Sequence, residues 1–155
     1  MNLEPTIRSV PKILVADDSL IIQKTVLMAL KQEGYQVLVS RDISEILSTV
    51  RREKPDVILL DLSYPLDADY VGGPSQDGFF VIEWLRRTSG SEKVPIIIIS
   101  AADPATYQNQ IQAYGIAACF RKPLNRVELL AAIQVALHPN HEASSANIAA
   151  TKSPP

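Results

Sequence analysis

The sequence predicts an α/β fold: a doubly wound, parallel sheet of five strands with five helices packed on its two faces. Short apolar runs rich in β-branched residues recur along the chain, which is typical of strands that are buried on both faces. Segments with apolar residues at helical spacing separate these runs. A regular alternation of the two kinds of segment is the pattern of a parallel sheet covered by helices on both sides.

The bulk composition fits one soluble globular domain. With 155 residues, 46% of them hydrophobic and 21% charged, the chain is long enough to bury a sizeable core. A formal net charge of −2 gives no electrostatic footprint for binding nucleic acid or an anionic membrane. No apolar run approaches membrane-spanning length, and residues 1–11 lack the layout of a signal peptide. The single cysteine cannot form an internal disulfide and favours a reducing, cytoplasmic setting.

The first predicted strand is an apolar run that ends in two carboxylates. Residues 12–18 read KILVADD, so that Asp17 and Asp18 stand where the strand stops. Ser19 follows as the expected N-cap of a helix, and Gly34 as the residue that ends it.

A second strand and helix follow. Residues 35–40 alternate enough in polarity to form a strand. Asp42, with Glu45 three residues later, begins a helix in the manner of a capping box, and Pro55 precedes the next strand.

The central strand is the apolar run at residues 57–60, and Asp61 follows it directly. Pro65 and the Gly-Gly-Pro cluster at residues 72–74 exclude regular structure immediately afterwards, and a helix is expected at residues 77–87. Asp61 is therefore expected at the carboxyl end of a central strand, the edge at which open α/β sheets bind ligands.

The fourth strand is predicted at residues 95–100, PIIIIS, and ends in Ser100. Asp103 and Pro104 form a typical helix start, as N-cap and first helical residue. Because the apolar face of that helix has only three residues, we expect it to be weakly anchored to the sheet.

The fifth strand is predicted at residues 116–120, and Lys122 follows it. Asn125 caps the last helix, whose expected buried stripe is Val127, Leu130, Ile133 and Leu137. Residues 139–155 are rich in Ala, Ser, Asn and Pro and predict a disordered tail. The expected organisation is therefore an N-terminal extension (1–10), one folded domain (11–138) and the tail (139–155).

The right-handed crossover rule leaves few topologies for such a chain, and the flavodoxin-like strand order 2-1-3-4-5 is the leading one. It places the first and third strands side by side, which brings Asp17, Asp18 and Asp61 to one crevice. Three carboxylates repel one another unless a cation is present, and an all-oxygen cluster favours Mg²⁺. With the hydroxyl of Ser100 and the ammonium of Lys122, the set suits a phosphoryl group, and Asp can itself be phosphorylated.

With these features the sequence resembles the receiver domain of two-component response regulators. The resemblance runs from about residue 12 to residue 137, almost the whole of the expected folded domain. It rests on four motifs in order, each at a strand end: Asp17-Asp18, Asp61, Ser100 and Lys122-Pro123.

The resemblance implies a role for each residue. Asp61 is the expected phosphoacceptor, Asp18 a direct Mg²⁺ ligand, and Asp17 a ligand acting through water. Ser63 is expected to offer its backbone carbonyl to the metal. The two remaining site residues, Ser100 and Lys122, are expected to bind phosphoryl oxygens, with the Lys122–Pro123 peptide bond in the cis form.

Two departures from the family pattern affect these expectations. An aromatic residue commonly stands three places before the lysine and relays phosphorylation to the surface, but Cys119 is found there. Either the relay is absent, or Phe120 or Tyr107 substitutes for it. The chain is also about nine residues longer than is usual after Asp61, with the insertion near residues 66–76, which we interpret as a lid over the site or a partner surface.

The expected function is that of a stand-alone response regulator receiver. A sensor histidine kinase or histidine phosphotransfer protein would donate the phosphoryl group, and a downstream protein target would bind the switched surface. No enzyme activity is expected beyond self-catalysed phosphoryl acceptance and autodephosphorylation, and a weak homodimer is compatible with the sequence. Two alternatives stay open: a phosphorylation-independent interaction module of the same fold, and an Asp-nucleophile phosphohydrolase, which usually has a second Asp where Ser63 stands.

Overall fold

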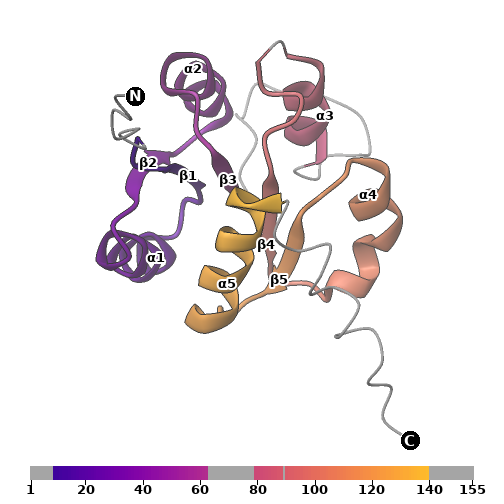
Figure 1. Cartoon of the computed structure of the whole chain (residues 1–155). Coiled ribbons are helices and arrows are strands. Elements are labelled where there is room, and N and C mark those ends of the chain that lie inside the picture. The colour runs from indigo at the N-terminus through magenta and orange to yellow at the C-terminus, as the bar shows by residue number, and fades with distance from the viewer. Residues whose placement is uncertain (1–8, 63–78, 89, 140–155) are drawn as a thin grey trace, which may run out of the picture.

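The computed structural model describes residues 9–62, 79–88 and 90–139 and contains one five-stranded sheet (Figure 1). The strand order is β2-β1-β3-β4-β5, and each neighbouring pair is parallel. This confirms the predicted fold class and strand order. Ser63, the insertion at 66–76 and the tail from residue 140 onward lie outside the described residues.

Strands and helices alternate along the whole described chain. Their bounds are β1 (Lys12–Ala16), α1 (Leu20–Gln32), β2 (Gln36–Ser40), α2 (Ile43–Glu53), β3 (Val57–Asp61), α3 (Phe79–Arg87), β4 (Ile96–Ser100), the 3₁₀ helix η1 (Pro104–Tyr107), α4 (Gln108–Ala113), β5 (Ala118–Arg121) and α5 (Arg126–Leu137). Across the described ranges, each helix is too short or too polar to cross a membrane.

The sheet divides the hydrophobic core into two layers, because successive strand residues point to opposite faces. Ile13, Leu59 and their counterparts on the other strands pack against α1 and α5 on one face. Leu14, Ile58 and their counterparts pack against α2, α3 and the segment that contains η1 and α4 on the other face. Figure 1 shows the same arrangement, with α1 and α5 together on one side of the sheet. Strands β3 and β4 lie between both layers, and all of their residues are buried.

Three helices begin at the caps that the sequence predicts. The side chain of Ser19 accepts the backbone N–H of Ile22, that of Asp42 accepts the N–H of Glu45, and that of Asn125 accepts the N–H of Glu128. Each oxygen satisfies a backbone donor that has no partner within its own helix. The lengths of these bonds are 3.4, 2.8 and 3.1 Å, in the same order.

The predicted buried stripe of α5 is wrong in part. Val127, which was expected inside, is 76% exposed, whereas Leu129 and Ile133 are buried. Leu130 and Leu137 are half-buried at the edge of that contact. Apolar residues occur on nearly every side of this helix, so their spacing does not single out one face.

The fifth strand begins two residues later than predicted, at Ala118 rather than Ile116. Ile116 is buried, but its N–H donates to the carbonyl of Ile111 at 3.0 Å and so closes the turn that follows α4. Pairing with β4 starts only after that turn.

The segment from Asp103 to Ala113 is two short helices and not the single helix predicted. Asp103 accepts the N–H of Ala105 at 2.9 Å and caps η1, and α4 then has only six residues. Neither helix has a buried residue, in agreement with the weak anchoring expected from the sequence. The rings of Tyr107 and Tyr114 lie 5.3 and 6.1 Å from the ring of Phe79 in α3 and form the aromatic part of the anchor.

Arg86 of α3 supplies the polar part of this anchor. Its guanidinium donates to the carbonyls of Tyr114 (3.1 Å), Val94 (2.7 Å), Gly115 (3.4 Å) and Glu92 (3.4 Å). Burial lowers the pKa of Arg86, and within the described residues all of its hydrogen-bond partners are main-chain oxygens. The C-terminal end of α4 is thus held to α3 through the backbone.

Candidate functional site

Two adjacent strands bring three carboxylates to the carboxyl edge of the sheet. In the β1–β3 register Ala16 pairs with Leu60, so Asp17 and Asp61 follow these partners side by side. One carboxylate oxygen from each of Asp17, Asp18 and Asp61 lies within 4.8 Å of the others. Asp17 and Asp61 are buried, and Asp18 is exposed. The convergence of these residues follows from parallel strands that end at one edge, as the sequence analysis expected.

Lys122 reaches this cluster from the end of β5. Its Nζ lies 3.0 Å from Oδ2 of Asp61 and 3.3 Å from Oδ2 of Asp17. The backbone N–H of Lys122 donates to the carbonyl of Ser100 at 2.8 Å, and the Lys122–Pro123 peptide bond is cis. Lys122 therefore contacts two of the three clustered carboxylates.

Ser100 lies at the same edge, at the end of β4. Asp61 pairs with Ile99 in the β3–β4 register, which puts Ser100 one position further along the neighbouring strand. The residue is almost fully buried, and its hydroxyl accepts the N–H of Ala102 at 3.1 Å. A serine hydroxyl that accepts one bond retains its own proton to donate to another oxygen.

Burial sets the electrostatics of Asp17. The carboxyl is completely removed from solvent, which raises its pKa, and the nearby charge of Asp61 raises it further. The N–H of Ser19, which donates to Oδ1 at 2.8 Å, and the charge of Lys122 act in the opposite direction, but the pKa remains raised.

Oδ2 of Asp17 is a buried atom that forms no hydrogen bond within the described residues. The ammonium of Lys122 lies close enough for an ion pair but not in hydrogen-bond geometry. For Lys122 itself burial lowers the pKa, but the hydrogen bond to Asp61 and the charges of Asp61 and Asp17 outweigh it, so the pKa is raised. The lysine is thus held in its charged form, but it does not provide a hydrogen bond to Oδ2 of Asp17.

The donor set fits a hard divalent cation. When ionised, the three carboxylates outnumber the one ammonium that the described residues bring into contact with them. All of the ligand atoms are oxygens, and one of them is the buried Oδ2 of Asp17, which has no hydrogen bond within the described part of the chain. Carboxylate oxygens with room for water and phosphate are the environment that Mg²⁺ takes in proteins. The expected carbonyl ligand of Ser63 lies outside the described residues.

The side chains of β5 bear on the question of an aromatic relay. Cys119 packs on the face that carries Tyr107, Ile111 and Tyr114, whereas Phe120 packs on the opposite face. Of the two proposed substitutes, Tyr107 therefore shares a face with Cys119 and Phe120 does not. Burial raises the pKa of the Cys119 thiol, which keeps it protonated and suits a small apolar filler.

Gln23, which lies against the acidic pair, is not among the site residues predicted from the sequence. This glutamine of α1 is buried, and its Nε2 donates to the main-chain carbonyl of Asp17. The available signal was a polar residue three places before the buried Val26, on the face of the helix that turns to the sheet.

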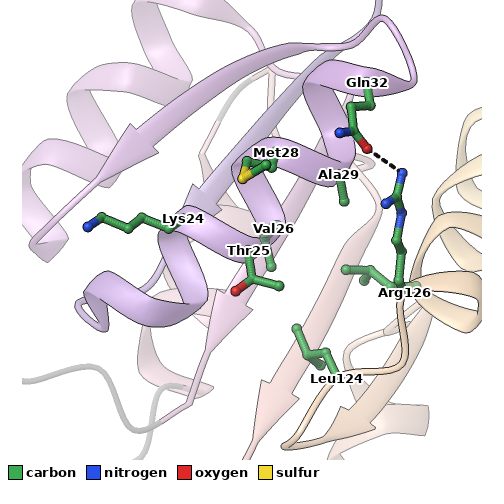
Figure 2. Close-up of a pocket in the computed structure, with 9 residues that line it drawn as sticks. Lys24, Thr25, Val26, Met28, Ala29, Gln32, Leu124 and Arg126 are labelled. Atoms are coloured by element: carbon green, nitrogen blue, oxygen red, sulfur yellow. Dashed lines mark hydrogen bonds between the residues drawn. The ribbon is translucent and has the colours of Figure 1, made fainter.

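A separate groove lies between α1 and the start of α5 (Figure 2). It measures about 280 Å³, and Oε1 of Gln32 accepts a bond from Arg126 at 2.7 Å across it. The carboxylates of the acidic cluster do not line it. The lining residues are Lys24, Thr25, Val26, Met28, Ala29, Gln32, Leu124, Arg126 and Leu129.

Comparisons with known proteins agree with this arrangement. The family model of the response regulator receiver domain matches residues 13–134. Transcriptional regulatory protein YxdJ of Bacillus subtilis is 36% identical over 90 residues, which are 58% of this chain and 34% of that protein. Protein PilH of Pseudomonas aeruginosa is 27% identical over 126 residues, which are 81% of this chain and 97% of that protein.

A solved structure gives the same result for the fold. The chemotaxis response regulator CheY4 of Vibrio cholerae superposes with a TM-score of 0.70 at 28% identity, over 83% of this chain and 100% of that one. The chain spans less than two thirds of the length of the first curated relatives that it matches, 34% of one and 52% of another.

Proposed function

The chain belongs to the response regulator receiver domain family, and from this membership we propose that it is a phosphorylation-dependent signalling protein whose phosphoacceptor is Asp61. The observation that carries the proposal is the 3.0 Å contact between Nζ of Lys122 and Oδ2 of Asp61, within a cluster that also contains Asp17 and Asp18. An acidic nucleophile beside an ammonium and a cation site suits a group whose transfer depends on positioning and charge neutralisation.

The proposed donor is a phosphohistidine on a sensor histidine kinase or a histidine phosphotransfer protein. A carboxylate oxygen of Asp61 attacks the phosphorus, and the new P–O bond forms as the P–N bond breaks. The leaving imidazole nitrogen keeps the electron pair of that bond and takes up a proton. Lys122 balances the charge on one phosphoryl oxygen, and the Ser100 hydroxyl donates to another.

The cation proposed for the cluster is Mg²⁺, with Asp18 and Asp61 as direct ligands, Asp17 as a ligand through water, and Ser63 as a carbonyl donor. When bound, it supplies positive charge that offsets the charge of the carboxylates and of the incoming phosphoryl group. The buried Oδ2 of Asp17, which has no hydrogen bond within the described part of the chain, supports this assignment.

The proposed output is a change in the population of two arrangements of the loop after Ser100 and of α4. Neither η1 nor α4 has a buried residue, so their arrangement is expected to cost less free energy to change than that of the strands. A downstream protein target would bind the rearranged surface. We propose that catalysis is limited to the protein's own phosphorylation and dephosphorylation, and that the exchange takes place in the cytoplasm.

The test is incubation of the protein with Mg²⁺ and a small acyl phosphate, followed by intact mass measurement. The wild type is expected to gain one phosphoryl group, and Asp61→Asn none. Asp56→Asn is the matched control, because this exposed aspartate stands just before the other end of β3 and binds the N–H of Lys12 at 2.8 Å. It should be phosphorylated like the wild type.

The alternatives give different results in the same experiment. Continuous release of inorganic phosphate with no phosphorylated protein in the intact mass would contradict the proposal and favour a phosphohydrolase, whereas release that accompanies a phosphorylated form is the expected autodephosphorylation. No phosphoryl gain in any variant, with the fold intact, would contradict it and favour the phosphorylation-independent module. The observation that favours the phosphorylation-independent module is Cys119, which stands where the family commonly has an aromatic relay residue.

A further inference from the structure

Both ends of Gln23 are bonded to the segment that carries the acidic pair. Its backbone N–H donates to the carbonyl of Ser19 at 2.9 Å, and its side-chain Nε2 donates to the carbonyl of Asp17. The second bond is the one hydrogen bond that the Asp17 carbonyl accepts within the described residues. A single residue of α1 thus makes two hydrogen bonds to the chain between the end of β1 and the start of the helix.

A polar side chain at this position needs an explanation. Gln23 is only 9% exposed, and Val26 and Leu30 on the same face of α1 are apolar. Burying an amide costs free energy unless it is hydrogen-bonded, whereas an apolar side chain would be buried without that requirement. We therefore attribute the glutamine at this position to the hydrogen bond that it donates to Asp17, and not to the space that its side chain fills.

That bond determines the orientation of the peptide unit between the two aspartates. The carbonyl of Asp17 and the N–H of Asp18 belong to one planar group, so holding the oxygen also fixes the backbone from which the Asp18 side chain projects. The Asp17 carboxylate has its own support in the N–H of Ser19. Among the described residues no hydrogen bond holds the Asp18 carboxylate, so its place in the 4.8 Å cluster depends on the backbone.

We propose that Gln23 is a positioning residue for the divalent-cation site, acting through the Asp17–Asp18 peptide. The inference rests on the proposed function, since it assigns a purpose to the same cluster. A residue that orients metal ligands from outside the ligand set typically contributes about 10- to 100-fold to metal affinity. The loss of its amide should therefore weaken cation binding without removing a ligand.

The test is calorimetric titration of the full chain with MgCl₂ and no phosphodonor. Gln23→Met has nearly the same size but no donor, and Mg²⁺ affinity is expected to fall about 10- to 100-fold. Gln32→Met is the matched control: it makes the same chemical change on the same helix, at a side chain that binds Arg126 across the α1–α5 groove (Figure 2), and should bind Mg²⁺ like the wild type. Circular dichroism verifies that each variant is fully folded during the titration.

A second measurement separates positioning from a general structural role. Amide hydrogen exchange should accelerate at Asp18 and Ser19 in Gln23→Met and remain unchanged in the strands. Should Gln23→Met fail to fold, Gln23→Glu carries the same test, because it keeps the size but sets an acceptor against the Asp17 carbonyl.

The outcomes are distinct. Wild-type affinity in the folded Gln23 variant overturns the inference and leaves the proposed function standing. A wild type that binds Mg²⁺ but takes up no phosphoryl group overturns the proposed function and leaves the positioning role intact. A wild type that binds no Mg²⁺ overturns both.

Discussion

The carboxyl edge of the sheet, which carries Asp17, Asp18 and Asp61 (the acidic edge), and the segment from η1 to α4 are packed in different ways. Asp61 ends a strand whose five residues are all buried between two hydrophobic layers. The helices η1 and α4 have no buried residue and rest on two tyrosine rings, Ile111 and the backbone bonds of Arg86. The proposed chemistry, which needs fixed distances, would thus lie on fully buried strands, and the element proposed to move is among those with the least buried surface.

The two regions also differ in the kind of unfavourable interaction that they contain. At the acidic edge Asp17 and Asp61 are buried, and the unfavourable contribution is electrostatic: the pKa of Asp17 is raised because its carboxyl is buried near Asp61. In the η1–α4 segment the described charges are few, and what is lacking is buried apolar area. Ligand binding would therefore relieve charge at one region, and partner binding would cover surface at the other.

The largest expected difference between the regions is in the cost of removing a core side chain. Ile58→Ala, in the centre of β3, should lower the free energy of unfolding by about 2 to 5 kcal/mol. Ile111→Ala in α4 should lower it by roughly 1 kcal/mol, because this side chain is only half-buried. Urea unfolding of the two variants measures both values, and equal losses would show that α4 is as firmly packed as the sheet.

A smaller effect is expected from the polar anchor of α4. Arg86→Met keeps the apolar stem but removes the donors to the carbonyls of Tyr114 and Val94, and should cost about 1 to 3 kcal/mol. Hydrogen exchange should rise in α4 and stay low in β3. The control is Arg87→Met, whose side chain is 78% exposed in a pair with Glu83 and should change stability by less than about 0.5 kcal/mol. Unchanged exchange in α4 would mean that the aromatic contacts suffice.

The smallest expected change comes from removing a charge at the acidic edge, and it raises the free energy of unfolding where the preceding substitutions lower it. Asp17→Asn should stabilise the cation-free protein at neutral pH by about 0.5 to 2 kcal/mol, since it removes a buried charge that repels Asp61. The same variant should gain less stability from added Mg²⁺ than the wild type does. A lower stability of the variant in the presence of a chelator would contradict the electrostatic account.

The pH dependence of this effect has a defined direction. Because the pKa of Asp17 in the fold is raised above 3.8, the folded chain retains the proton to a higher pH than the unfolded chain. The stabilising contribution is thus present below pH 3.8 and is lost as the pH rises through the raised value. Thermal unfolding in chelator should show wild type and Asp17→Asn close together at low pH and diverging above that range.

The sequence predicts the sheet and its polar edge well, since both depend on local patterns and one topological rule. Apolar runs such as β3 and β4 are unambiguous, and parallel strands bring their ends to one edge. The position of four site residues at this edge therefore follows from local patterns and the strand order. These residues are Asp17, Asp18, Asp61 and Lys122.

The buried face of α5 and the roles of Gln23 and Arg86 could not be read from the sequence. On α5 the apolar residues surround the helix, so packing and not spacing decides that Val127 is outside. Glutamine and arginine are ordinary residues of helix surfaces. Their bonding partners here are main-chain oxygens of other segments. Because every residue has a main-chain carbonyl, the sequence does not indicate which one will accept such a bond.

The use of carbonyl oxygens by Arg86 also affects how this protein can diversify. Every residue type presents the same carbonyl, so substitutions at Glu92 or Val94 leave acceptors in place for the guanidinium. Gly115 is more restricted, because its φ of +61° favours glycine. The outward residues of α4 are under no such restriction, which allows new recognition surfaces to evolve on a helix whose attachment does not depend on them.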